Sequence, residues 1–150
     1  MNRVASVRKA FEGESDPGLF SPHYVSHAPW DRLVQLHAKG QTEAGRAMFR
    51  AKKVFADCDV SMDDAFEDGD QVVVRWRLRG TWTHPMPGIS IKPTGRPIDL
   101  AGISIYQFKG DQIVAKYGEF DVAAFHAQAC ENVRAQECAQ DLAALGGVRT

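Results

Sequence analysis

Apolar residues in the first third of the chain recur at helical spacing, and turn residues interrupt them. The pattern predicts a short helix over residues 2–11, which ends before a glycine- and proline-containing turn. Ser21-Pro22 resembles a helix N-cap followed by a proline at the first helical position, so a brief second helix is expected over residues 23–27. A partly helical connection over 29–41 then leads to an amphipathic helix over 42–56.

The second half of the chain alternates apolar and polar residues with the period of two that is typical of β-strands. Four such segments predict an antiparallel sheet: Cys58–Phe66, Gln71–Thr83, Pro97–Lys109 and Gln112–Phe120. Tight hairpins are expected around Gly69 and Gly110, and a longer loop over 84–96. An alanine-rich tail over 122–145 is helix-competent.

Helices followed by consecutive strands, with no strand–helix alternation, predict an α+β fold in a single domain over residues 1–150. Long antiparallel strands under helices indicate a curved half-barrel. The tail helix over 122–145 is expected to pack on the rim of the sheet or on a partner subunit.

A regular hairpin at Gly110 would determine which residues of the last two strands share a face. The expected pairs are Phe108–Ile113, Tyr106–Ala115, Ser104–Tyr117, Gly102–Glu119 and Leu100–Asp121. Periodicity alone leaves open which face is the concave one, but the polar side chains of this set suit a pocket better than a core. The opposite face is apolar enough to suggest a homodimer interface; its residues are Ile103, Ile105, Val114, Lys116 and Phe120.

Trp76 and Trp82 alternate along their strand with three arginines, Arg75, Arg77 and Arg79. We expect the tryptophans to line the cavity and the arginines to face outward, because such a row is more often a solvated or interface stripe than an anion site.

Asp121 ends the last predicted strand, at the expected mouth of the apolar cavity. Desolvation there would raise the pKa of the carboxyl group toward neutrality, so that it could move a proton at a carbon next to a carbonyl. Asp121 could instead cap the helix that begins at Val122, and spacing alone favours the cap. Glu119 could share the proton transfer or bind the ligand, or form an ion pair at the rim.

Two histidines, His23 and His27, are four residues apart, a spacing that can hold a metal on a helix. No third ligand is predictable, so a metal site is not expected. His27 alone remains a candidate pocket residue.

Charge and composition exclude several partners. Eighteen basic and nineteen acidic residues leave a net charge of −1, which offers no field for nucleic acid or an anionic membrane. The three cysteines lack the close spacing of a zinc or redox motif, which suggests reduced thiols in the cytoplasm. Without an apolar run of about 18 residues, neither export nor membrane insertion is expected.

Nearly the whole chain resembles the SnoaL-like polyketide cyclases, within the nuclear transport factor 2-like superfamily of cone-shaped α+β barrels. The segments that carry the resemblance are Phe20 to His27, Gly69 to Trp76, Gly80 to Thr83, Pro93 to Pro97 and Gly102 to Val114, ending on Asp121. It implies that Asp121 is the acid/base group of a cofactor-independent aldol ring closure, and that His27 has a pocket role. Gly80-Thr81-Trp82 departs from the family's glycine-threonine-histidine, so the pocket polarity is expected to differ.

The sequence therefore predicts a cyclase- or isomerase-type enzyme for a hydrophobic, polyketide-like carbonyl ligand. The expected catalytic residues are Asp121 and His27, and the expected ligand contacts are Trp76, Trp82, Ser104, Tyr106, Tyr117 and Glu119. Isomerisation, dehydration or epoxide opening in the same pocket is the alternative. A non-catalytic binding or dimerisation module is an alternative of another class.

Overall fold

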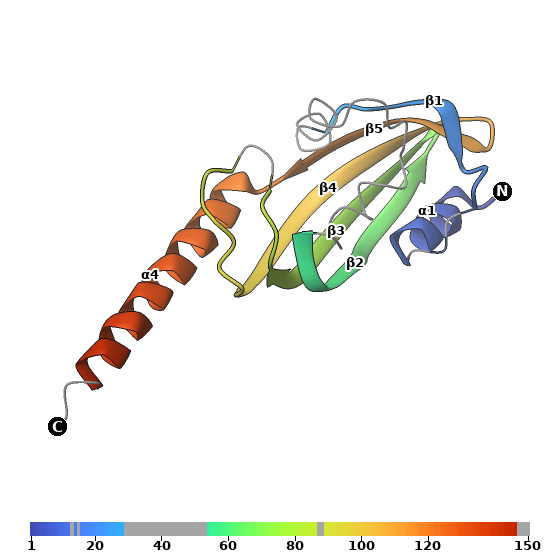
Figure 1. Ribbon diagram of the computed structural model, residues 1–150. Helices are drawn as coiled ribbons and strands as arrows, with labels where there is room; N and C mark the ends of the chain where they lie inside the picture. The colour runs from blue at the N-terminus through green and yellow to red at the C-terminus, as the bar shows by residue number, and fades with distance from the viewer. Residues whose placement is uncertain (13, 15, 29–53, 87–88, 147–150) are drawn as a thin grey trace.

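The structure, a computed structural model, describes residues 1–12, 14, 16–28, 54–86 and 89–146. Within this part of the chain a helix, five strands and a long helix follow one another (Figure 1). They are α1 (Arg3–Glu12), β1 (Phe20–Ser26), β2 (Phe55–Asp68), β3 (Gln71–Trp82), β4 (Pro97–Lys109), β5 (Gln112–Phe120) and α4 (Val122–Gly146). The predicted α+β architecture is confirmed.

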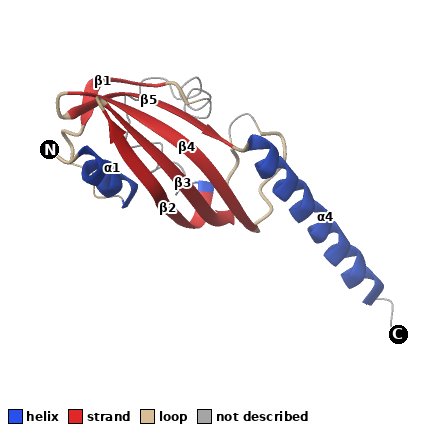
Figure 2. Ribbon diagram, turned by 180° about the vertical axis from the view of Figure 1, so that it is seen from behind, coloured by secondary structure: helices blue, strands red, loops and turns tan. Residues whose placement is uncertain are grey.

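The strands form one mixed sheet in the order β1-β5-β4-β3-β2. Strands β2 to β5 are an antiparallel meander, as predicted, whereas β1 joins the sheet parallel to β5. Among the described residues the sheet is open, with β1 and β2 as its edges (Figure 2).

The helix predicted over residues 23–27 is wrong, because this segment belongs to β1 and its end. Local cap chemistry at Ser21-Pro22 is outweighed by pairing with β5, where Val25 lies opposite Ala115. Proline is tolerated because β1 is an edge strand. The predictions for 29–41 and for 42–53 lie outside the described residues, and Phe55 already belongs to β2.

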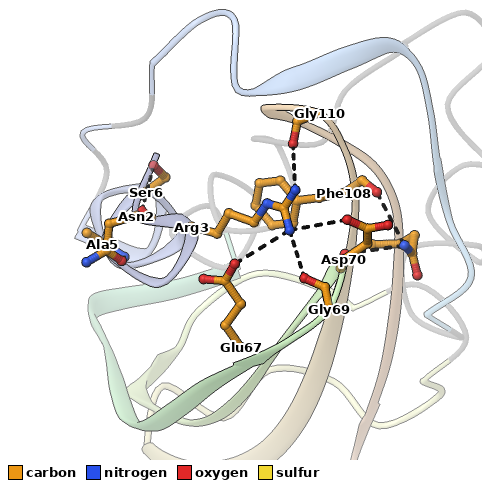
Figure 3. A network of polar contacts seen from close by, with 10 residues as sticks. Asn2, Arg3, Ala5, Ser6, Glu67, Gly69, Asp70, Phe108 and Gly110 are labelled. Atoms are coloured by element: carbon orange, nitrogen blue, oxygen red, sulfur yellow. Dashed lines mark hydrogen bonds and ion pairs between the residues drawn. The ribbon is translucent and has the colours of Figure 1, made fainter.

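Arg3 fastens α1 to both hairpin turns of the sheet (Figure 3). Its guanidinium donates to the backbone carbonyl of Gly69 at 2.8 Å and to that of Gly110 at 3.0 Å. The same group lies 3.3 Å from a carboxylate oxygen of Asp70 and 3.5 Å from one of Glu67. One cation thus joins the β2–β3 and β4–β5 turns to the start of the chain.

The inner face of the sheet, which we define as the face that carries the buried core, holds two hydrophobic clusters. The first lies under α1 and consists of Val7, Phe11, Leu19, Val72, Val74, Tyr106, Phe108 and Ile113. The second lies under the start of α4 and consists of Val54, Phe55, Leu78, Trp82, Met86, Ile98, Leu100, Phe125 and Ala129. Trp76 and Val60 pack against both clusters, so they mark the middle of the inner face.

A β-bulge near the start of β5 changes the register that the hairpin predicts. Phe108 pairs with Ile113 as expected, but Gln107 pairs with Ala115, which leaves Val114 as an extra residue. From there on, each β5 side chain lies on the face opposite to the predicted one. The observed pairs are Tyr106–Lys116, Ile105–Tyr117, Ser104–Gly118, Ile103–Glu119 and Gly102–Phe120.

The predicted faces of the β5 residues beyond the bulge are therefore wrong. Lys116 and Phe120, expected on the outer face, lie on the inner one, and Tyr117 and Glu119 lie on the outer face with Ile103. The predictions for β3 and β4 are confirmed. Trp76, Trp82, Ser104 and Tyr106 face inward, and Arg75, Arg77 and Arg79 face outward.

Asp121 caps α4 at the end of the sheet. Its Oδ1 accepts a hydrogen bond from the Ala124 backbone N–H at 2.8 Å. Phe125 and Ala129 of the first turns are buried, and the Gln128 amide bonds both the N–H and the C=O of Asp99. Farther along, α4 leaves the sheet, and all its residues from 134 to 146 are exposed (Figures 1 and 2).

Gly102 should be indispensable to the middle of the inner face. A Cβ at this position would overlap the Trp76 ring and lie 2.7 Å from the Glu119 carbonyl oxygen. We expect Gly102→Ala to lower the free energy of unfolding by about 1–3 kcal/mol, because the ring must move. Chemical denaturation measures this, with Ala101→Ser on the outer face as a control expected within about 0.5 kcal/mol of the original. Equal stability of both variants would contradict the packing described.

Candidate functional site

Ser104 and Trp76 form a hydrogen-bonded pair in the middle of the inner face. Ser104 is 2% exposed, and its Oγ accepts a hydrogen bond from the indole N–H of Trp76 at 3.0 Å. The pair requires space at two neighbouring positions, and both of them are glycines. Gly102 lets the indole lie against β4, and Gly118 lies directly across from Ser104 on β5.

The Ser104 hydroxyl still has a proton to donate. A serine hydroxyl offers one donor and two acceptor sites, and Trp76 uses one of the acceptors. Among the described residues no acceptor takes the hydroxyl proton. A buried donor without an acceptor costs free energy, so a carbonyl oxygen placed against Ser104 would supply the missing partner.

Two further polar side chains lie on the inner face beside this pair. Lys116 is half-buried and lies across from Tyr106 of β4 and Ser26 of β1. Ser26 is itself 3% exposed. The inner face thus brings together hydroxyl groups, an indole and an ammonium group. Its apolar surroundings include Val60, Met62 and Phe120.

Lys116 and Ser26 were not predicted as inner-face residues from the sequence. The segment that contains Ser26 is predicted as a helix. Lys116 is predicted on the outer face because apolar and polar residues alternate regularly on both sides of the bulge, so the sequence does not reveal it. The half-polar composition of β1, which mixes Phe20 and Tyr24 with Ser21 and Ser26, is the signal that could have indicated a strand.

Two predicted ligand contacts belong to the packed core. Trp82 is fully buried, donates its indole N–H to the His84 carbonyl at 2.8 Å, and meets Phe125 edge to face at 5.1 Å between ring centroids. Tyr106 is also buried, with its ring edge against Phe11. Both lie on the predicted face, and their contact with a ligand stays a prediction.

The histidine and the tyrosine that were predicted to line the pocket contact each other on the outer side of the sheet instead. The rings of His27 and Tyr117 stack at 4.7 Å, and both side chains are exposed on the outer side. His23 and His27 lie on and just after a strand, where four residues span about 13 Å, so the metal-binding spacing of a helix does not apply. Among the described residues, no group of three or more metal-ligating side chains occurs.

The two predicted carboxylates lie at the border of the sheet. Glu119 is exposed on the outer face, across from Ile103. Asp121 is exposed and follows Phe120, whose side chain is on the inner face. Its Oδ1 is taken by the helix cap, whereas no hydrogen bond of the described residues engages Oδ2. The predicted convergence of Tyr117 and Glu119 with Ser104 is wrong, and proton transfer by Asp121 stays a prediction.

No helix in the described part of the chain is long and apolar enough to cross a membrane. The cysteines that the structure describes are free thiols: Cys58 is half-buried, and Cys130 and Cys138 are exposed on α4.

Solved structures share this fold. AclR from Streptomyces galilaeus, described as a proposed hydroxylase, superimposes with a TM-score of 0.64 at 13% identity, over 86% of this chain and 96% of its own. IdmH from Streptomyces antibioticus, described as a proposed polyketide cyclase, gives 0.61 at 24% identity, over 85% and 95%. TsrD from Streptomyces laurentii gives 0.62 at 20% identity, over 85% and 92%. At these identities the likeness shows the fold.

No match was found among curated proteins. The family comparison is more specific, because one model covers residues 18–129, which include β1, the whole meander and the buried first turns of α4. By that match the chain belongs to the SnoaL-like polyketide cyclase family.

Proposed function

We propose that the protein binds a hydrophobic, carbonyl-bearing small molecule on the middle of the inner face and moves a proton on it without a cofactor. The observation that carries this proposal is the buried Ser104 hydroxyl, whose proton has no acceptor among the described residues. A ligand carbonyl is the simplest group that would satisfy it. The family match supports a carbonyl ligand of the polyketide type.

The surroundings of Ser104 suit a flat, apolar ligand. Trp76 presents an aromatic ring that is already held by its hydrogen bond to Ser104. Val60, Met62 and Phe120 supply apolar contacts. Small-molecule sites usually have a mainly apolar lining with a few polar groups.

The reaction that fits is an intramolecular aldol closure or a related enolisation. Asp121 takes a proton from the carbon next to the carbonyl, and the resulting enolate attacks a second carbonyl to form the carbon–carbon bond. The same carboxyl group then returns the proton to the alkoxide oxygen. Two features support Asp121 in this role: its Oδ2 is not engaged by the described residues, and it directly follows inner-face residue Phe120.

Ser104→Ala should weaken binding without loss of fold. With the neutral aromatic ketone 2-acetonaphthone as the probe, we expect the Kd from calorimetry to rise about 3- to 10-fold, which is the usual effect of one neutral hydrogen bond. Ser61→Ala removes an exposed hydroxyl from the outer side of β2 and serves as the control. If both variants bind like the original protein, Ser104 does not hold the carbonyl.

Asp121→Asn separates proton transfer from helix capping. Asparagine caps a helix about as well as aspartate, so stability should change little, whereas Asp121→Ala should cost about 0.5–2 kcal/mol. Deuterium uptake at the activated methylene of 2-tetralone, followed by proton NMR in heavy water, reports enolisation. We expect Asp121→Asn to slow the enzyme-dependent uptake by about 100-fold or more, because general acid/base catalysis contributes at least that much.

Two results would contradict this mechanism. Unchanged deuterium uptake in the Asn variant would exclude Asp121 as the base. Tight binding of 2-tetralone with no uptake above buffer, even in the original protein, would instead favour the non-catalytic binding module.

We also propose that the outer face of the sheet binds a second copy of the chain. Ile103 and Tyr117 are 51% and 47% exposed there, beside charges of both signs that include Arg75 and Glu119. Such a mixed, partly apolar surface can complement itself in a symmetric dimer.

Ile103→Glu should shift the protein toward the monomer in sedimentation velocity, because it places a charge inside the proposed interface. Leu142→Glu is the matched control, since Leu142 is also an exposed apolar residue but lies on the far part of α4. Dissociation by the control variant, and not by Ile103→Glu, would assign the interface to α4 instead.

A further inference from the structure

The geometry points to an anion-binding position at Lys116, next to the carbonyl-binding Ser104. We infer that the ammonium group of Lys116 holds a carboxylate, or the enolate formed from the ligand, on the inner face. This inference rests on the proposed function, because it requires a ligand on the same face.

The bulge at Val114 is what brings Lys116 inward. Without the extra residue, the hairpin would place Lys116 on the outer face and Ala115 on the inner one. With it, Lys116 lies across from Tyr106 on one side and from Ser26 on the other, and its side chain is half-buried. The bulge thus places the one lysine of β5 on the face that carries Ser104 and Trp76.

Lys116 and Ser104 lie within reach of the same ligand. Ser104 faces Gly118, two residues beyond Lys116, so the pair is diagonal across β4 and β5. Diagonal neighbours are about 7–8 Å apart, which the four-carbon stem of lysine can span. Gly118 adds no side chain between them.

The charges of the strands favour an anion on this face. Asp59, Asp64, Asp99 and Glu119 all lie at outward positions of the sheet. Glu67 lies at an inward position, on edge strand β2 beside Arg3. Lys116 already has a contact within the chain, so an incoming anion would add to that contact or replace it.

The ligand class that follows is a flat aromatic or polyketide-like acid. Its anionic group would meet Lys116, its carbonyl would meet Ser104, and its ring system would lie near Trp76. The same ammonium group would stabilise negative charge that develops on oxygen during enolisation.

Paired probes of nearly equal shape test this inference by calorimetry. The anion 2-naphthoate and the neutral ketone 2-acetonaphthone differ mainly in charge. We expect the original protein to bind 2-naphthoate about 10-fold more tightly than the ketone. In Lys116→Met the Kd of 2-naphthoate should rise about 10-fold or more, while that of the ketone stays within about 3-fold. Lys116→Arg should retain the preference for the anion.

Lys109→Met is the matched control, because it removes the same charge from an exposed position at the β4–β5 hairpin. Should Lys116→Met fail to fold, Lys116→Gln makes the same comparison with a polar side chain. An unchanged ratio of the two Kd values in the Lys116 variant would overturn the anion site while leaving the carbonyl site intact. Binding of neither probe by the original protein would overturn the proposed function itself.

Discussion

A single extra residue in β5 determines which side chains the inner face contains. Val114 has no partner in β4. Every later side chain of β5 therefore lies on the opposite face from the one that a regular hairpin at Gly110 would give it. Lys116, Gly118 and Phe120 therefore lie inside, and Tyr117 and Glu119 lie outside. The ammonium group, the glycine that leaves space beside Ser104, and the apolar wall all follow from that one insertion.

Gly102 and Gly118 leave space for the side chains that this register brings together. Each lies across from a side chain that projects over the strand, Trp76 in one case and Ser104 in the other. A side chain at either position would meet these groups at 3.1 Å or closer. The bulge selects the residues, and the two glycines let the indole and the hydroxyl meet in a hydrogen bond. Arg3 fixes the other end of the sheet, so the inner face is closed by α1 there.

Much of the sheet could be predicted from the sequence, because alternation is a local signal. The predicted bounds of β4 and β5 agree with the structure, as do the inward positions of Trp76 and Ser104. The register of β5 could not be predicted, since the alternation is regular on both sides of the bulge and only the pairing across strands reveals the offset. β1 was missed for a related reason: Ser21-Pro22 favours a helix locally, and its partner β5 lies about ninety residues away in the chain.

Asp121 lies just beyond the end of β5. Side chains alternate between the two faces of the sheet only as far as Phe120, where β5 ends. After Phe120, the direction of a side chain depends on how α4 begins. The cap bond from Ala124 holds one carboxylate oxygen, and Phe125 holds the first turn of α4 against the core of the inner face. The direction of the second oxygen is therefore a property of helix docking. Proton transfer at this position would depend on the packing of Phe125 and Ala129 as much as on the carboxylate itself.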